Sequence, residues 1–203
     1  MKLYYMPGAC PLTDHIVLEW IGAPYEVVEV KRDKLKSPEF LKISPAGMVP
    51  ALVDGDLVLT ENVAILHYLA DLHPDQQLAG DGTPRGRAEV NHWLGFINSD
   101  MHQSFKPIFA PERFVADKSQ HAELAVNASK RLRGLFELVN VPLTRHDWLA
   151  GATRSIADPY LFVLLRWAKA KAIDLSGLDG LERFFKRMQN DAGVKAAMHA
   201  EGI

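Results

Sequence analysis

The chain has a single cysteine among its 203 residues, and it lacks long apolar runs and long stretches of one charge. One cysteine excludes an internal disulfide and fits a reducing compartment. The apolar runs are too short to span a bilayer, and no charged segment followed by an apolar one opens the chain, so we expect neither a membrane anchor nor a signal peptide. The formal net charge of −2 argues against nucleic acid and anionic membranes as partners. We therefore expect a cytoplasmic protein.

The hydrophobic periodicity divides the chain into two parts. The first part alternates strand and helix patterns, at Lys2–Tyr5, Leu12–Ile21, Tyr25–Val30, Ser37–Ile43, Pro50–Val53, Leu57–Leu59 and Glu61–Leu72. Residues 73–84 are rich in Pro, Gly and Asp, which favour turns, so we expect a linker there. Only helical patterns follow, at Arg85–Phe105, His121–Val139, Ala157–Ala172, Leu178–Gln189 and Gly193–His199. The sequence predicts an α/β domain at residues 1–77 and an all-helical domain at residues 84–203.

Cys10 lies where the first strand turns into the first helix, followed by Pro11 at a position that suits the first helical turn. Unpaired backbone N–H groups and the helix dipole favour an anion there, so we expect the thiol to be shifted toward the reactive thiolate. The alternative is a buried, inert thiol. Because Thr13 stands where a dithiol motif has its second cysteine, an external thiol would have to resolve a disulfide formed at Cys10.

Two further segments suggest binding of a peptide-like ligand. Pro50 opens a strand, and the turn before it leaves the N–H and C=O groups of Val49 free to pair with an extended ligand. At Thr60-Glu61-Asn62 we expect Thr60 to cap a helix whose first N–H groups hold a carboxylate, while the Glu61 side chain binds an ammonium group. A carboxylate and an ammonium on one carbon describe an amino-acid head group. The alternative is an ordinary acidic residue in a first helical turn.

Together these segments resemble a glutathione S-transferase. The resemblance rests on Tyr5, Pro7-Gly8-Ala9-Cys10, Gly47-Met48-Val49-Pro50-Ala51-Leu52, Thr60-Glu61 and Ser155-Ile156-Ala157-Asp158. Cys10 and His102 are typical of the bacterial beta class. The resemblance implies a thioredoxin-like N-terminal domain that binds glutathione as co-substrate, and a helical domain that lines the site of a small hydrophobic electrophile. It also implies a homodimer and a cis peptide bond before Pro50.

The resemblance implies that Cys10 and His102 are catalytic. Cys10 would lie beside the sulfur of glutathione, and His102 would approach the same sulfur from the helical domain. A neutral His102 could accept the thiol proton, whereas an imidazolium could stabilise the thiolate. His15 is expected to face packing or solvent. The other implied glutathione-binding residues are Tyr5, Lys34 (or Lys36), Val49, Pro50, Glu61 and Asn62.

The remaining expectations concern the helical domain. Ser155 and Asp158 are predicted to form a capping box that starts an apolar core helix. Phe105, Phe109 and Trp167 are candidates for the electrophile pocket, although aromatic residues at helical spacing are more often core. We assign no metal ligands.

Three residues depart from the family pattern. Asn62 stands where a small hydroxyl residue is common, Gln103 where lysine is frequent, and Gly95 where a polar side chain can reach the ligand. The leading hypothesis is conjugation of glutathione to electrophiles, with thiol-transferase or peroxidase activity through a Cys10 mixed disulfide. The alternatives are a non-catalytic interaction protein with the same fold and a glutathione-dependent dehalogenase or isomerase.

Overall fold

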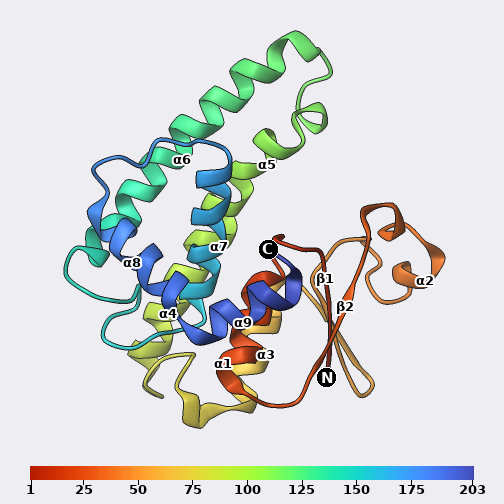
Figure 1. Ribbon diagram of the computed structural model, residues 1–203, viewed down its shortest axis with the longest axis vertical. Helices are drawn as coiled ribbons and strands as arrows, with labels where there is room; N and C mark the ends of the chain where they lie inside the picture. The colour runs from red at the N-terminus through yellow and green to blue at the C-terminus, as the bar shows by residue number, and fades with distance from the viewer.

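The computed structural model describes residues 1–203. In Figure 1 the N-terminal sheet lies on one side and most helices of the second half lie on the other. The last helix returns to the N-terminal half, so the C-terminus lies close to the first strand (Figure 1). The last residues of the chain therefore lie with its N-terminal half.

The N-terminal half contains a four-stranded sheet in the order β2-β1-β3-β4. β1 (Lys2–Tyr5) pairs in parallel with β2 (Glu26–Glu29) and antiparallel with β3 (Ala51–Asp54), which pairs antiparallel with β4 (Leu57–Thr60). Helix α1 (Leu12–Ile21) connects the parallel pair, as such a pair requires, and packs against α3 (Asn62–Leu72). With the short α2 (Pro38–Leu41), this is the thioredoxin-like fold that the sequence indicated.

Local sequence explains the ends of these elements. Gly22 adopts a left-handed conformation with φ of 73°, and its N–H donates to the carbonyl of Leu18 and ends α1. Gly55, with φ of 60°, provides the turn of the β3–β4 hairpin. Both glycines lie where the sequence predicts a boundary, directly after the helix at Leu12–Ile21 and between the strands at Pro50–Val53 and Leu57–Leu59.

The second half is all helical. Its helices are α4 (Pro84–Phe96), α5 (Gln103–Phe109), α6 (His121–Leu143), α7 (Ala157–Ala170), α8 (Asp179–Asn190) and α9 (Ala192–Glu201). The single helix predicted at Arg85–Phe105 is wrong in one respect, because a π-helical segment, η3 (Ile97–His102), separates α4 from α5. A widened turn of this kind keeps the helical direction, so the apolar spacing does not reveal it. Only short 3₁₀ turns add to these helices, and no helix is both long enough and apolar enough to span a membrane.

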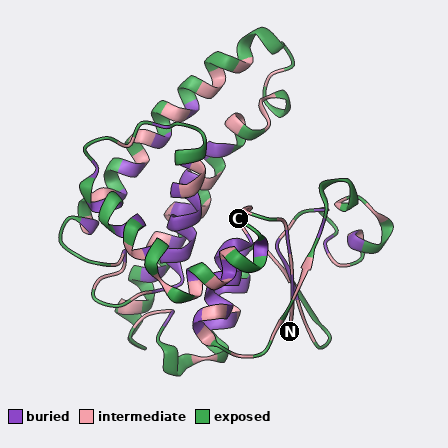
Figure 2. Cartoon of the chain, in the orientation of Figure 1, coloured by how far each residue is buried: buried purple, intermediate pink, exposed green.

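Helix α7 occupies the centre of the core that the two halves share. Its residues Tyr160–Leu165 are all buried, and the helix contacts α1 as well as α4 and α8. Figure 2 shows buried residues gathered along α7 and α1, with exposed residues on the outer helices. One continuous apolar core therefore holds the sheet domain and the helical domain together.

The predicted capping box at the start of α7 forms in one of its two halves, because the N–H of Asp158 donates to the Ser155 carbonyl and not to the Ser155 hydroxyl. The Ser155 N–H donates to the Asp158 carboxylate at 2.7 Å, and the Ser155 hydroxyl accepts from the N–H of Ala157 at 3.3 Å. The second carboxylate oxygen of Asp158 accepts from the N–H of Leu149 at 3.0 Å. The box therefore also holds the loop that precedes the helix.

Candidate functional site

A cavity of about 160 Å³ opens between the sheet domain and the helical domain. Its lining combines the turn before α1, the loop before β3, the start of α3, and residues of η3, α5 and α7. The lining residues are Cys10, Ser44, Ala46, Met48, Val49, Pro50, Thr60, Glu61, Asn62, Asn98, His102, Gln103, Lys106 and Tyr160. The structure thus brings six predicted site residues together: Cys10, Val49, Pro50, Glu61, Asn62 and His102.

Cys10 lies against the loop that carries the predicted cis proline. The Val49–Pro50 peptide bond is cis, as the family resemblance implied. The Cys10 thiol donates to the carbonyl of Val49 at 3.7 Å, while the Val49 N–H has no partner among the turn and loop hydrogen bonds. One backbone group of Val49 therefore remains free to pair with a ligand, and the other faces the thiol.

The prediction that the start of α1 shifts Cys10 toward the thiolate is wrong for this structure. Burial, together with the nearby carboxyl groups of Asp14 and Glu61, raises the pKa of the Cys10 thiol to about 12. The N–H groups of Leu12 and Thr13 donate within the turn, to the carbonyls of Ala9 and Cys10, and are not free to hold an anion. Cys10 is therefore a protonated thiol at neutral pH when no ligand is bound.

Contacts from distant parts of the chain hold the turn before Cys10. The N–H of Gly8 donates to the Glu201 carboxylate at 2.9 Å, and its carbonyl accepts from the Trp167 indole N–H at 2.9 Å. The other Glu201 oxygen lies 3.0 Å from Nδ1 of His15, and the side chains of this pair are wholly buried. His15 thus packs inside the protein, as expected. Glu201, which sequence reasoning missed, links α9 to the Cys10 turn.

The start of α3 differs from the predicted cap. Glu61, not Thr60, is the N-cap residue, and its side chain forms no capping hydrogen bond. Glu61 has φ of 74°, in the left-handed region that non-glycine residues rarely adopt. Such conformations concentrate at binding sites. The exposed Glu61 carboxylate and the first N–H groups of α3 consequently face the cavity with no cap between them.

Asn62 contributes to the site in a way the sequence did not indicate. Its side chain is buried, and its amide donates to the Cys10 carbonyl at 3.1 Å. The amide oxygen has no hydrogen-bond partner in the chain. Asn62 therefore supports the Cys10 turn through its side chain, while its backbone N–H lies at the start of α3.

His102 reaches the cavity from the end of η3. Burial, and to a lesser extent the nearby charge of Lys106, lowers the pKa of His102 to about 4. The imidazole is therefore neutral at neutral pH, which favours the first of the two predicted roles over a resting imidazolium. Lys106 lies one helical turn beyond His102 and also lines the cavity. The sequence reasoning missed Lys106, although a spacing of four residues places it on the same helix face as His102.

Two other missed residues contact His102 or lie next to it. The hydroxyl of Tyr160, on α7, lies 2.6 Å from Nδ1 of His102 and donates to the amide oxygen of Asn98 at 3.0 Å. Both Tyr160 and Asn98 line the cavity. Tyr160 follows the capping box by two residues, but its sequence pattern is that of a core residue.

Tyr5 and Lys34 are not brought to the cavity. Tyr5 is buried, with its ring 5.9 Å from that of His15, and Lys34 is exposed in a short 3₁₀ turn. Lys36 instead lies at the cavity edge, where its ammonium donates to the carbonyl of Ala46 at 2.6 Å. Gly47 permits this approach, since a Cβ there would lie 2.8 Å from the Lys36 side chain and only 2.5 Å from a backbone carbonyl.

An aromatic cluster lies beside His102, outside the lining of the cavity. The ring of Trp167 is 5.1 Å from His102 and 5.2 Å from Phe109, which stacks on the fully buried Phe105 at 5.7 Å. Phe109 is 47% exposed, so one edge of the cluster is open to solvent. Gly95 lies away from the cavity, and its carbonyl accepts from the hydroxyl of Ser99. No group of three or more His, Cys, Asp or Glu side chains is placed to hold a metal ion.

Comparison with known proteins identifies the family. Residues 1–71 match the family model described as glutathione S-transferase, N-terminal domain, and residues 97–191 match the C-terminal domain model. The chain is 48% identical to glutathione S-transferase GST-4.5 of Xanthomonas campestris pv. campestris, and the match covers 100% of both chains. This chain therefore belongs to the glutathione S-transferase family.

Solved structures agree with this assignment. A glutathione S-transferase from Xylella fastidiosa superposes with a TM-score of 0.96 at 46% identity, over 100% of this chain and 98% of that one. A bacterial beta-class enzyme from Sphingomonas chungbukensis gives 0.88 at 37% identity, over 100% and 99%. A sphingomonad glutathione S-transferase solved in complex with glutathione gives 0.88 at 35% identity, over 100% of both chains. The predicted resemblance to bacterial beta-class enzymes is confirmed.

Proposed function

We propose that this glutathione transferase binds glutathione in the cavity beside Cys10 and transfers its thiolate to small hydrophobic electrophiles. The observation that carries the proposal is the composition of the cavity. It joins a peptide-pairing loop, a carboxylate and an uncapped helix start from the sheet domain to His102 and Lys106 of the helical domain. Residues suited to bind glutathione and residues suited to activate its thiol therefore lie in one cavity.

Each binding feature corresponds to one part of glutathione. The γ-glutamyl carboxylate would bind at the first N–H groups of α3, including that of Asn62, and its ammonium would pair with Glu61. The cysteinyl unit would pair with the backbone of Val49 beside the cis Pro50. Lys36, in place of Lys34, would meet the glycyl carboxylate at the cavity edge. This assignment leaves the glutathione sulfur between Cys10 and His102.

The neutral imidazole of His102 would accept the thiol proton of glutathione. The S–H bond breaks, its electron pair stays on sulfur, and the proton moves to the ring nitrogen. The nearby positive charge of Lys106 favours the resulting thiolate. The thiolate then attacks an electrophile held beside the aromatic cluster of Phe105, Phe109 and Trp167. Tyr5 does not line the cavity, so a role for it in binding glutathione would be indirect.

A second activity, thiol transfer, is favoured by the free thiol of Cys10 in the cavity wall. The small deprotonated fraction of Cys10 would attack a mixed disulfide between glutathione and another thiol, forming a Cys10–glutathione disulfide and releasing the other thiol as its thiolate. A second glutathione would then attack this adduct, restore Cys10 and leave as oxidised glutathione. Replacing Cys10 by alanine should abolish the adduct seen by intact mass after incubation with oxidised glutathione. An adduct that survives in the variant would contradict this second activity.

The main test combines glutathione affinity with a panel of electrophiles, disulfides and hydroperoxides. We expect His102→Ala to lower conjugation by about 100-fold, as loss of a general base does, with little change in glutathione affinity by calorimetry. His146→Ala, which removes an exposed histidine outside the cavity, is the matched control. Absence of glutathione binding by the unmodified protein would refute the proposal and favour a non-catalytic interaction protein.

The broader assignments are also part of the proposal. Residues 1–77 would form the glutathione-binding domain and residues 84–203 the domain that lines the electrophile site. A homodimer is supported by exposed apolar side chains on the edge strand β4, Leu57 and Val58, and at the end of α3, Leu72. Light scattering of the protein as it elutes from a size-exclusion column measures its mass and so tests the dimer. We also propose a role in detoxification, through conjugation of hydrophobic electrophiles, and a cytoplasmic location.

A further inference from the structure

The Tyr160 hydroxyl joins two groups that both come from the π-helical segment η3. It lies 2.6 Å from Nδ1 of His102 and 3.0 Å from the amide oxygen of Asn98, four residues earlier in the same segment. Tyr160 is fully buried, and burial raises the pKa of its hydroxyl far above the ordinary value. The hydroxyl therefore keeps its single proton, which only one of the two neighbours can receive.

The chemistry of these neighbours decides where the proton goes. An amide oxygen can only accept, so Tyr160 donates its proton to Asn98. The hydroxyl oxygen must then accept from His102, which places an N–H on Nδ1. A neutral imidazole carries only one N–H, so Nε2 has a free lone pair. Nε2 has no hydrogen-bond partner in the chain, yet it is not among the buried unpaired atoms, unlike Nε2 of His15.

We infer that Asn98 and Tyr160 are positioning residues that hold His102 in the Nδ1–H tautomer and so present Nε2 to the cavity as the proton acceptor. The inference rests on the proposed function for the identity of the proton donor, the glutathione thiol. The tautomer itself follows from the hydrogen-bond directions and holds without any ligand. With the opposite tautomer, the group facing glutathione would be an N–H donor and could not accept its proton.

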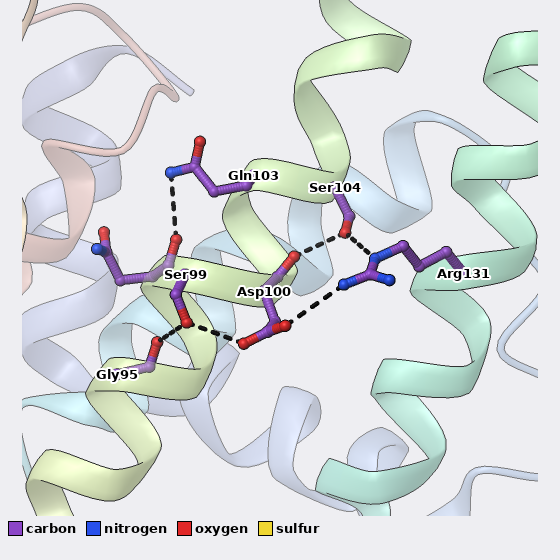
Figure 3. A network of polar contacts seen from close by, with 7 residues as sticks. Gly95, Ser99, Asp100, Gln103, Ser104 and Arg131 are labelled. Atoms are coloured by element: carbon purple, nitrogen blue, oxygen red, sulfur yellow. Dashed lines mark hydrogen bonds and ion pairs between the residues drawn. The ribbon is translucent and has the colours of Figure 1, made fainter.

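Polar contacts hold the segment that carries Asn98 and His102. The Ser99 hydroxyl donates to the Gly95 carbonyl at 2.8 Å, and the Ser104 hydroxyl donates to the Asp100 carbonyl at 2.6 Å. Figure 3 shows Arg131 reaching from α6 to the Ser104 hydroxyl, at 3.0 Å, and to the Asp100 carboxylate, at 3.4 Å.

The side-chain amide of Gln103 donates to the carbonyl of Asn98 at 3.3 Å. The π-helical turn is thus supported by contacts from Gln103 and from Arg131 of α6, while Tyr160 of α7 contacts Asn98 and His102. This support keeps Asn98 and His102 at the spacing that one hydroxyl can bridge.

The test measures ring-nitrogen resonances of the ¹⁵N-labelled full-length protein at pH 7 without glutathione. A His102→Gln sample assigns the His102 signals. We expect a protonated Nδ1 and an unprotonated Nε2. Asn98→Asp keeps an acceptor and should keep this signature. Asn98→Leu removes the acceptor. Tyr160 should then donate its proton to Nδ1 of His102, and the N–H of the imidazole should move to Nε2. Circular dichroism verifies that each variant is folded.

Kinetics provide the second readout. We expect Asn98→Leu to lower the kcat/KM for 1-chloro-2,4-dinitrobenzene at least tenfold, with glutathione affinity changed less than twofold. An Nε2–H signature for His102 in the unmodified protein would overturn the inference, whatever the kinetics show. An Nδ1–H signature that Asn98→Leu leaves unchanged would also overturn it. If the protein shows the expected signatures but conjugates no electrophile, the result would support the positioning role of Asn98 and Tyr160 and contradict the proposed function.

Discussion

Replacing Glu201 by alanine would remove a buried carboxylate that links the last helix to the turn before Cys10. Glu201 is 5% exposed, and its two oxygens contact the N–H of Gly8 at 2.9 Å and Nδ1 of His15 at 3.0 Å. The substitution leaves the buried His15 ring and the partly buried Gly8 N–H without this partner. Because hydrogen bonds to a charged group contribute about 1.5–3 kcal/mol each, we expect the loss of the two contacts to lower the free energy of unfolding by about 3–6 kcal/mol.

Urea denaturation followed by circular dichroism measures this loss. Glu201→Gln keeps one acceptor oxygen, so its loss should be about half that of the alanine variant. Glu112→Ala is the matched control, because Glu112 is exposed and forms no ion pair or side-chain hydrogen bond; its unfolding free energy should change by less than about 0.5 kcal/mol. A loss below about 1 kcal/mol for Glu201→Ala would refute the reasoning that α9 is held through this carboxylate.

Three further predictions concern the thiol, the helix cap and the indole contact. With a pKa of about 12, Cys10 should react slowly with iodoacetamide at pH 7 and faster at each higher pH up to 10; a rate that is already maximal at pH 7 would contradict the raised pKa. Burial raises the pKa of Asp158 to about 6, so the proton binds more tightly in the folded state. That stabilisation is complete below the unfolded pKa near 3.8 and is lost as the pH rises through about 6. In urea denaturation the stability of the unmodified protein relative to Asp158→Asn should therefore fall by up to about 3 kcal/mol between pH 4 and 6.5, and a constant difference would refute it. Trp167→Phe loses the bond to the Gly8 carbonyl and should unfold about 1 kcal/mol more easily, whereas Trp93→Phe, which loses no hydrogen bond, should not; equal losses would remove the role of the indole N–H.

Most of the architecture could be predicted because its signals are local. Gly22 ends α1 and Gly55 makes the hairpin turn, since both adopt left-handed backbone conformations that favour glycine. The contact between Ser155 and Asp158 at the start of α7 joins residues only three positions apart, so its signal is local. The π-helical turn before His102 escaped prediction, because it changes one hydrogen-bond spacing without changing the apolar pattern.

The candidate site was predicted in part. The Cys10 turn, the Val49–Pro50 loop and Glu61 are short motifs, and the structure brings them to one cavity. Tyr160 escaped notice, because a tyrosine in a buried apolar helix has the sequence pattern of a core residue whatever its hydroxyl contacts. Its partner Asn98 is 62 residues away, and nothing in the sequence pairs the two.

The amino-acid sequence was sufficient for the family, the two-domain order and the identity of the thiol, because each depends on residue types at short and regular spacing. The ionisation of that thiol required the folded chain. A helix start favours the thiolate, but packing against the neighbouring loop buries the sulfur near carboxyl groups and raises its pKa to about 12. The contact that holds its turn joins residues 193 positions apart. Burial and long-range contacts are properties of the packed molecule, so they set the state of Cys10 and the direction of the His102 ring.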